Sequence, residues 1–283
     1  MTRLNVDGKV VVITGGSRGL GLHCAEALLK HGAKSIYITS RKQKAVDDAV
    51  IYLKDIVDKF KEKNQFYNKG NGIKIHGLAA DISTAQGNIK FVELVSKYED
   101  KVDILIPNAG ASWGAPLTKH PEEAFDKVLD LNIKGVFLTI QKFYPLLLKA
   151  GSSDYSARIL IMGSVAGISP NLGLMGGTYG YLSSKAGVAH LGKSLALELG
   201  PQNINVNILA PGFIPSKMSN GLLSKFGKEF ADKNPKKRIG TNKDLESAVL
   251  FFSAKESDYI NGAIIPIDGG QHLGDAPAFS SIL

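Results

Sequence analysis

Short runs of β-branched and apolar residues alternate with longer amphipathic segments along nearly the whole chain. This alternation is typical of βα units, which build a parallel sheet with helices on both faces. The runs predict seven strands, near Lys9–Thr14, Ser35–Thr39, Ile73–Ala79, Asp103–Pro107, Arg158–Met162, Asn205–Leu209 and Ala263–Ile267. The amphipathic segments predict helices near Leu20–His31, Lys42–Lys61, Thr84–Tyr98, Pro121–Lys149, Tyr179–Leu199 and Lys243–Phe252. We therefore expect an α/β fold with a doubly wound, seven-stranded parallel sheet.

The composition fits one soluble globular domain. The chain has 283 residues, of which 44% are hydrophobic and 21% charged. Residues 61–72 are rich in Lys, Asn and Gly and are expected to form a surface insertion; nothing elsewhere reads as a linker, so a single domain over residues 1–283 is predicted. Cys24 stands alone, which excludes an intramolecular disulfide, and no metal-ligand spacing occurs. Without a long apolar run, the chain is expected to be cytoplasmic.

The net charge of +8 raises the question of a polyanionic partner. Many lysines fall in two polar stretches, Lys54 to Lys74 and Lys225 to Lys243, without interleaved aromatic residues that could stack on bases. A solvated surface is therefore the preferred interpretation, and neither nucleic acid nor a membrane is expected as a partner. A small phosphorylated cofactor also suits a basic protein.

A glycine-rich loop joins the first expected strand to the first expected helix. Such a loop allows backbone N–H groups and the helix N-terminus to approach a pyrophosphate, although an ordinary strand-to-helix turn is the alternative. Together with the alternation above, it predicts a single-domain Rossmann fold. The residues expected to contact the cofactor here are Gly15, Ser17, Arg18, Gly19, Leu20 and Gly21.

The residues after the second expected strand favour NADP(H) over NAD(H). An NAD enzyme usually places an acidic residue about 20 residues past the glycine loop. No Asp or Glu occurs between Lys34 and Val46, whereas Arg41 ends the strand and Arg18 lies inside the loop. Guanidinium groups match a phosphate with forked hydrogen bonds, so both are expected to hold a 2′-phosphate. The alternative is two solvated arginines.

Tyr181 and Lys185 stand four residues apart on an expected helix, so their side chains project from one face. A nearby ammonium favours the phenolate and lowers the pKa of the phenol, which makes proton exchange with a carbonyl or alcohol oxygen feasible. The alternative for the isolated pair is a surface tyrosine stacked on a lysine stem.

An ordered set of motifs accompanies this pair: Thr14-Gly-x-x-x-Gly19-x-Gly21, Asp81, Asn108-Ala109-Gly110, Asn132, Ser164, Tyr181-x-x-x-Lys185 and Pro211-Gly212. The set resembles the short-chain dehydrogenase/reductase family from Lys9 to about Leu273. The pattern is most similar to NADPH-dependent 3-oxoacyl-carrier-protein reductases and related carbonyl reductases. The resemblance implies hydride transfer to a carbonyl group and assembly as a dimer or tetramer through Pro121–Lys149 and Tyr179–Leu199, with a monomer as the alternative.

The resemblance also assigns catalytic roles. Tyr181 would be the general acid, and Lys185 would lower its pKa and bind the nicotinamide ribose. Ser164 would orient the substrate oxygen, with a simple helix cap as the alternative. Asn132 would hold a water through which Lys185 exchanges protons, and a buried structural Asn is its rival.

Further cofactor contacts follow from the same resemblance. Asp81 would bind the adenine amino group, unless it only ends its strand, and Asn108 is expected to be partly architectural. The contacts implied beyond the glycine loop are Asp81, Ile82, Asn108, Ala109, Gly110, Tyr181, Lys185, Pro211, Gly212, Ile214 and Ser216. Three departures are Pro107 before Asn-Ala-Gly, Ser216 in place of Thr, and extra residues around 171–177.

The segment 213–237 is expected to form a lid over the substrate. Its apolar residues Met218, Leu222, Leu223, Phe226 and Phe230 are spaced as on a helix, and packing on the protein's own core is the alternative. With Trp113 and Leu174-Met175 they favour an apolar or extended substrate, such as a ketone or a 3-oxoacyl thioester. A polyol or sugar dehydrogenase is the runner-up, and a non-catalytic NADPH-binding protein is a third hypothesis.

Overall fold

The computed structural model describes residues 4–62, 72–170 and 176–275. Within these ranges seven parallel strands form one sheet in the order β3-β2-β1-β4-β5-β6-β7. The strands are β1 (Val10–Thr14), β2 (Ser35–Ser40), β3 (Lys74–Ala79), β4 (Ile104–Ile106), β5 (Ala157–Met162), β6 (Ile204–Pro211) and β7 (Ile264–Ile267). Each predicted strand is confirmed, with ends that differ by one or two residues. The single α/β domain is the expected Rossmann architecture.

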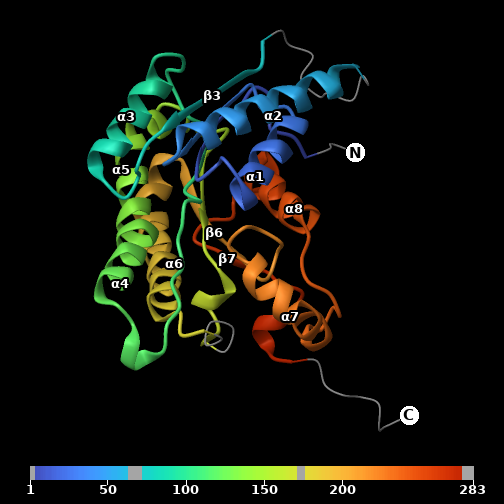
Figure 1. The fold of residues 1–283 in the computed structure, drawn as a ribbon. Helices are drawn as coiled ribbons and strands as arrows, with labels where there is room; N and C mark the ends of the chain where they lie inside the picture. Colours follow the sequence, from blue (N-terminus) through green and yellow to red (C-terminus); the bar gives the residue numbers. More distant parts are fainter. Residues whose placement is uncertain (1–3, 63–71, 171–175, 276–283) are drawn as a thin grey trace.

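Helices cover both faces of the sheet (Figure 1). They are α1 (Gly19–Lys30), α2 (Gln43–Glu62), α3 (Ala85–Ser96), α4 (Glu122–Leu129), α5 (Gly135–Leu148), α6 (Tyr179–Leu199), α7 (Asn220–Lys233) and α8 (Asn242–Ser253). One hydrophobic cluster joins the sheet to α1, α2 and α8, and a second joins it to α3, α5 and α6. None of the described helices is long and apolar enough to cross a membrane.

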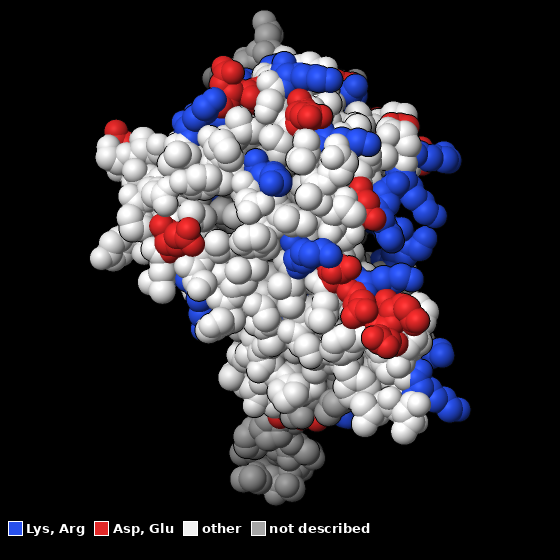
Figure 2. All heavy atoms as spheres, turned by 90° about the vertical axis from the view of Figure 1, so that its left-hand side faces the viewer, with Lys and Arg blue, Asp and Glu red and all other residues white. Residues whose placement is uncertain are grey.

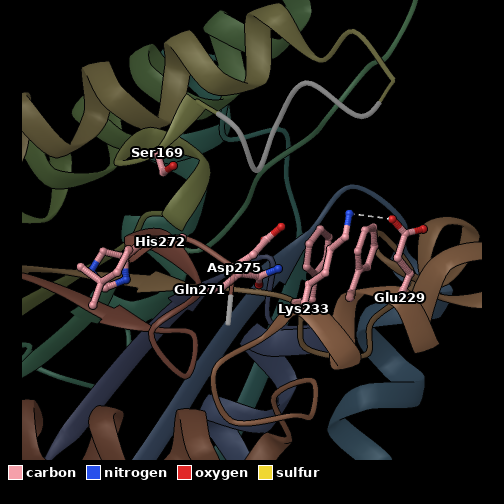
Figure 3. A pocket seen from close by; sticks show the side chains of 10 residues that line it. Ser169, Glu229, Lys233, Gln271, His272 and Asp275 are labelled. Atoms are coloured by element: carbon pink, nitrogen blue, oxygen red, sulfur yellow. Dashed lines mark ion pairs between the residues drawn. The ribbon is translucent and has the colours of Figure 1, made fainter. Parts of the chain in front are cut away.

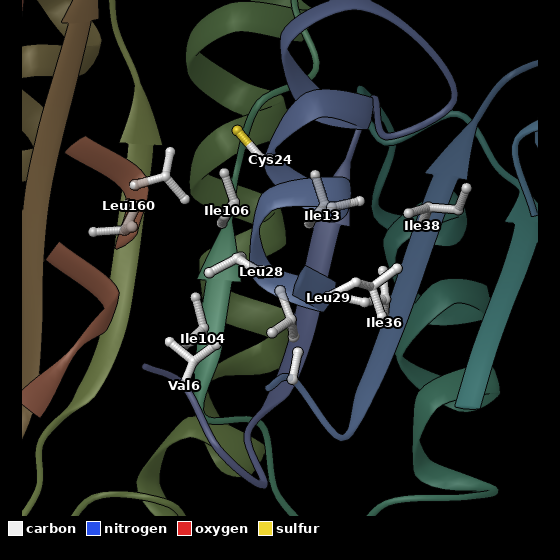
Figure 4. Packing of buried hydrophobic residues seen from close by; sticks show 14 of the residues in the cluster. Val6, Ile13, Cys24, Leu28, Leu29, Ile36, Ile38, Ile104, Ile106 and Leu160 are labelled. Atoms are coloured by element: carbon white, nitrogen blue, oxygen red, sulfur yellow. The ribbon is translucent and has the colours of Figure 1, made fainter. Parts of the chain in front are cut away.

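The cluster under α1 shows why the strands are so apolar. Cys24, Leu28 and Leu29 of this helix pack on Ile13 and Ile106, and all of these side chains are buried (Figure 4). β1 is buried along its full length, because helices cover it on both faces. The second cluster lies on the other face, where an edge-to-face pair joins α3 to α5.

Two elements differ from the sequence prediction. The helix expected over Pro121–Lys149 is divided into α4 and α5 by a π-helical turn, η2 (Asp130–Lys134). No Gly or Pro marks this turn within its own five residues, so the apolar periodicity alone does not reveal it. The helix α7 was anticipated only as a helically spaced stripe within the lid segment. Most of the predicted insertion, residues 63–71, lies outside the described residues.

Candidate active site

The strand order reverses between β1 and β4, and the functional side chains gather at the carboxyl ends of these central strands. In open α/β sheets this reversal leaves a crevice for a ligand. The turn after β1 is tight because side chains would not fit there. A Cβ on Gly16 would lie 2.6 Å from the Ile38 side chain, and one on Gly21 would lie 2.4 Å from the Asn108 amide nitrogen. Gly15 has a φ of 66°, a conformation that glycine adopts without strain.

The first turn of α1 is suited to an anion. Arg18 precedes the helix in an extended conformation and its side chain makes no capping hydrogen bond. The N–H groups of this turn, and the positive end of the helix dipole, are therefore available to a phosphate group. Gly19 has a φ of 54°, and a Cβ there would have only Ser216 near it, at 3.5 Å. The partly buried Ser17 lies in the same turn.

Asn108 ties the glycine turn to the end of β4. Its side-chain amide donates to the carbonyl oxygens of Thr14 and Gly15 at 2.9 and 3.2 Å. The backbone N–H groups of Asn108 and Ala109 both donate to the Thr14 hydroxyl at 3.1 Å. The architectural role expected for Asn108 is therefore present in the structure.

The two arginines are exposed, and neither forms an ion pair with any residue that the structure describes. Arg41 directly follows β2, as expected. Asp81 is exposed after β3, where its carboxylate accepts hydrogen bonds from the N–H and hydroxyl groups of Ser83 at 3.1 and 2.7 Å. This turn matches the strand-ending alternative for Asp81, and its contact with adenine stays a prediction. Ile82 beside it is buried.

Tyr181 and Ser164 line the same cavity. Burial raises the pKa of the Tyr181 phenol, and the influence of the Ser164 hydroxyl opposes this rise. The sequence argument expected Lys185 to lower that pKa, and this expectation is wrong for the structure in hand because loss of hydration dominates. Ser164 also caps η3 (Val165–Gly167) by accepting from the N–H of Ala166 at 3.2 Å, so the helix-cap alternative holds as well.

Lys185 is buried behind the tyrosine. Its Nζ donates to the Met162 carbonyl oxygen at 2.7 Å and lies 5.7 Å from the centre of the Tyr181 ring. Burial lowers the pKa of this ammonium to about 8. The two side chains share one side of α6 as predicted. The surface-pair alternative is excluded, because Lys185 is only 5% exposed.

Asn132 lies in the π-turn and is fully buried. Its Oδ1 accepts from the N–H of Ala111 at 2.9 Å, and its Nδ2 donates at 2.9 Å to the Ala111 carbonyl and to the Ser184 hydroxyl. A Cβ on Gly110 would lie 3.3 Å from the Asn132 Oδ1 and 3.7 Å from the Lys185 Nζ. These contacts support the structural rival, and the water-holding role stays a prediction. A π-turn at such a position often accompanies a functional site.

A cavity of about 170 Å³ opens beside the tyrosine. The loop after β6 forms one wall, fixed by the hydroxyl of Ser219, which donates to the Ile214 carbonyl and accepts from the Ser216 N–H. We call it the catalytic cavity; its lining is Leu20, Ser112, Gly163, Ser164, Val165, Ala166, Thr178, Tyr181, Pro211, Gly212, Phe213, Ile214, Ser216, Met218, Ser219 and Leu222. Catalytic and cofactor candidates from four distant segments therefore meet at one place.

Some apolar residues of the lid segment border the cavity, as expected for a lid, and others pack on the protein itself, as the alternative interpretation has it. Met218 and Leu222 line the catalytic cavity, whereas Phe230 is buried and stacks on Phe213 with ring centres 4.3 Å apart. Trp113, expected near the substrate, is 52% exposed and lines neither this cavity nor the one described next. Leu174-Met175 and most of the longer loop lie outside the described residues.

Sequence reasoning missed a second cavity, of about 590 Å³, which shares Phe213 with the first. Figure 3 shows its labelled side chains coming from three segments: Ser169 after η3, Glu229 and Lys233 of α7, and the residues that follow β7. The last group consists of the residues of η7 (Gln271–Leu273) and those directly after it. The only signal in the sequence was the pair Gly269-Gly270, which indicates a turn and no function.

Comparison with known proteins identifies the group to which this site belongs. Residues 9–225 match the short chain dehydrogenase family. A rhamnolipids-biosynthesis 3-oxoacyl-[acyl-carrier-protein] reductase of Pseudomonas aeruginosa is 35% identical over 272 residues, which cover 95% of this chain and 98% of that protein. The 3-oxoacyl-[acyl-carrier-protein] reductase FabG of Buchnera aphidicola is 33% identical over 94% of this chain and 98% of its own length.

Solved structures agree with these relatives. The Pseudomonas aeruginosa RhlG/NADP active-site complex superposes with a TM-score of 0.84 at 33% identity, covering 96% of this chain and all of that one. Levodione reductase has a TM-score of 0.80 at 27% identity, over 95% of this chain and 99% of its own. The motifs occur in order, the seven-stranded parallel sheet is present, and these relatives match almost the full length, so the chain belongs to the short-chain dehydrogenase family.

Proposed function

We propose that this protein is an NADPH-dependent oxidoreductase that reduces a 3-oxoacyl type carbonyl to a secondary alcohol, with Tyr181 as the general acid. The observation that carries the catalytic assignment is the presence of Tyr181 and Ser164 together at the wall of the catalytic cavity, where the Ser164 hydroxyl influences the Tyr181 phenol. A carbonyl oxygen placed between the two hydroxyl groups receives a hydrogen bond from each. Because burial keeps the phenol protonated at neutral pH, Tyr181 has a proton to donate as the carbonyl carbon is reduced.

Lys185 and Asn132, which are both buried, support this proton transfer. Lys185 reaches the site beside Gly110, on the same side as the Asn132 oxygen. With a pKa of about 8, its ammonium exchanges protons easily near neutral pH and is suited to restoring the tyrosine proton. Asn132 holds the backbone at Ala111 and the hydroxyl of Ser184, which in turn donates to the Tyr181 carbonyl at 2.7 Å. It therefore positions the segment that carries the acid.

The carboxyl edge of the sheet fits a dinucleotide with a 2′-phosphate. The uncapped first turn of α1, the tight glycine turn and the exposed arginines are each suited to an anion. Bound NADPH supplies the hydride, and the chain supplies the proton and the orientation of the carbonyl. The residues that would hold it are those given by the resemblance, from Gly15 to Ser216, with Arg18 and Arg41 at the 2′-phosphate.

The substrate assignment follows the relatives, which are named 3-oxoacyl-[acyl-carrier-protein] reductases. A polyol or sugar dehydrogenase is not favoured by them, and neither is a non-catalytic NADPH-binding protein. The segment 213–237 acts as the lid in this proposal, because Met218 and Leu222 border the catalytic cavity. We place the protein in the cytoplasm, where its single buried thiol suits a reducing compartment.

We also propose a homo-oligomer, a dimer or tetramer, that pairs through α4 and α5. Figure 2 faces the side of the molecule where α3, α4 and α5 lie, and its middle carries few charged side chains. Phe137 and Leu148 of α5 are 41% and 43% exposed, although both are large apolar residues. A second copy that covers this face would remove them from water.

The experiment that tests the function is an assay of ketones, 3-oxoacyl thioesters and sugars at a fixed NADPH concentration, repeated with NADH. Oxidation of NADPH by 3-oxoacyl thioesters, with little turnover of NADH, is expected. Absence of turnover with every carbonyl compound, or turnover of sugars alone, contradicts the proposal.

A further inference from the structure

The second cavity lies between α7 and η7, beside the catalytic cavity. Gln271 lines it and is only 8% exposed, and its side-chain amide has no hydrogen-bond partner among the residues that the structure describes. The amide is accessible from the cavity, so it can pair there with water or with a polar ligand.

The neighbouring imidazole is held in one orientation. His272 directs its Nδ1 at the Asp268 carboxylate, 2.8 Å away, and its backbone N–H donates to the same carboxylate at 2.7 Å. Asp268 is 2% exposed and also accepts from the N–H of Gly270 at 2.9 Å. A carboxylate partner fixes Nδ1 as the donor, so the neutral ring keeps Nε2 as a hydrogen-bond acceptor.

The walls of the cavity are tied together. Asn234, just after α7, donates from its buried amide to the Asp268 carbonyl at 2.7 Å and accepts from the N–H of Lys236 at 2.8 Å. The stacked rings of Phe213 and Phe230 join the start of the lid segment to α7. The end of α7 and the turn before η7 therefore hold a fixed separation, and the cavity is part of the fold.

The second cavity borders the catalytic cavity at Phe213, and Gln271 lies near Gly212 of the catalytic cavity. Phe213 borders both cavities, and a Cβ on Gly212 would lie 3.8 Å from the Gln271 Oε1. A carbonyl held by Tyr181 carries two substituents, and one of them can extend past Phe213 toward Gln271. An alkyl chain there would cover the amide of Gln271 without satisfying it, whereas an amide group would pair with both Gln271 and His272.

We propose that the cavity between α7 and η7 binds the amide-bearing pantetheine arm of a thioester substrate, with Gln271 and His272 recognising its amide groups. The inference rests on the proposed reduction of 3-oxoacyl thioesters. Gln271 supplies a donor and an acceptor, and the Nε2 of His272 accepts from an amide N–H. The alkyl end of the substrate then remains beside Met218 and Leu222 in the catalytic cavity.

The first test compares two substrates that share one reacting carbonyl. Acetoacetyl-pantetheine carries the amide arm, and S-ethyl acetoacetate thioester lacks it. In the variant Gln271→Met, which keeps the length of the side chain, the ratio of kcat/KM between the two substrates is expected to fall roughly tenfold through KM. Gln86→Met, at an exposed position on α3, is the matched control and should keep the wild-type ratio. General damage to the fold lowers both substrates equally and leaves the ratio unchanged, which would overturn the inference.

The second test needs no turnover and separates the two proposals. Pantetheine itself is titrated into the NADP-bound protein, and its dissociation constant is followed by NMR chemical shifts. Binding by the wild type and by Gln86→Met, weakened roughly tenfold in Gln271→Met and in His272→Phe, supports the cavity assignment. Lack of binding by the wild type, or equal binding by the Gln271 variant, overturns it. Pantetheine binding without reduction of either thioester contradicts the proposed function and leaves the arm site standing.

Discussion

The behaviour of Tyr181 and Lys185 depends on their burial more than on their spacing. A spacing of four positions on a helix places both on one side, but burial moves their pKa values in opposite directions. It raises the pKa of the phenol and lowers the pKa of the ammonium, because each neutral form is favoured where water is excluded. A neutral phenol is the correct starting state for an acid in carbonyl reduction.

Replacing Tyr181 by Phe should lower kcat at least about 100-fold, because it removes the group that protonates the carbonyl oxygen. NADPH binding, measured by fluorescence titration, should be retained. Tyr179→Phe on the same helix is the matched control and should keep most activity. Full activity in Tyr181→Phe would exclude the assignment.

Lys185 should also leave a signature in the pH dependence of stability. Below about pH 8 the ammonium is charged in both the native and the unfolded states, so the full cost of burying it is present. Between pH 8 and 10.5 the native state releases this proton while the unfolded state keeps it, so stability rises with pH. The difference between the two pKa values corresponds to about 3 kcal/mol.

The measurement is urea unfolding of the wild type and Lys185→Met across this range. The free energy of unfolding of the wild type, minus that of Lys185→Met, should increase as the pH rises from 7.5 to 10.5. Loss of the hydrogen bond to Met162 in Lys185→Met changes the free energy of unfolding by the same amount at each pH. It does not alter how the difference between the two proteins depends on pH. Lys193→Met, at an exposed position on α6, should behave as the wild type does. Parallel curves for the wild type and Lys185→Met would show that the ammonium is not buried.

Arg18 and Arg41 should set the choice of cofactor. Removing either guanidinium, in Arg18→Ala or Arg41→Ala, should raise the dissociation constant of NADPH about tenfold, because each loses a charge-assisted contact to the 2′-phosphate. Binding of NADH, which lacks that phosphate, should change little. Lys44→Ala is the neighbouring control. Equal losses for both cofactors would place the two arginines elsewhere on the nucleotide.

At the scale of elements, the site is shaped by how closely backbones approach one another. The glycines after β1 allow α1 and Asn108 to meet, and the π-turn brings Asn132 to the loop after β4. The start of α3 packs equally closely against the end of β3. There, a Cβ on Gly87 would lie 1.9 Å from the Asp81 carbonyl oxygen.

Gly87→Ala should therefore lower the free energy of unfolding by on the order of 3 kcal/mol, since a backbone atom cannot move aside as a side chain does. The contrast is Gly227→Ala in the middle of α7, where the nearest atom is the Leu223 Cβ at 3.9 Å. That substitution should raise stability by about 0.5–1 kcal/mol, because alanine favours the helix. Urea unfolding measures both, and equal effects would show that α3 is not packed on Asp81.

At the scale of the whole molecule, the sheet joins two functions on two surfaces. Its carboxyl edge holds both cavities, whereas the face formed by α4 and α5 leaves apolar side chains in water. The proposed catalytic residues all come from one chain.

Phe137→Asp should convert the proposed oligomer into smaller species, because an isologous interface would bury the new carboxylate together with its copy. Light scattering coupled to size-exclusion chromatography measures the mass. Tyr259→Asp, at a fully exposed position before β7, is a control away from α5. A wild-type protein of monomer mass would contradict the proposal.

The pattern of residues along the chain was enough to predict the seven strands, most of the helices and the order of the motifs. The spacing of apolar residues can be read from neighbouring positions in the sequence. A chain of alternating strands and helices can then adopt only a few topologies. The pKa directions of Tyr181 and Lys185, the π-turn at Asn132 and the position of the Gln271 amide at a cavity wall became visible in the folded molecule alone. Each of these depends on which distant segment excludes water or supplies a partner, and residue spacing along the chain does not contain that information.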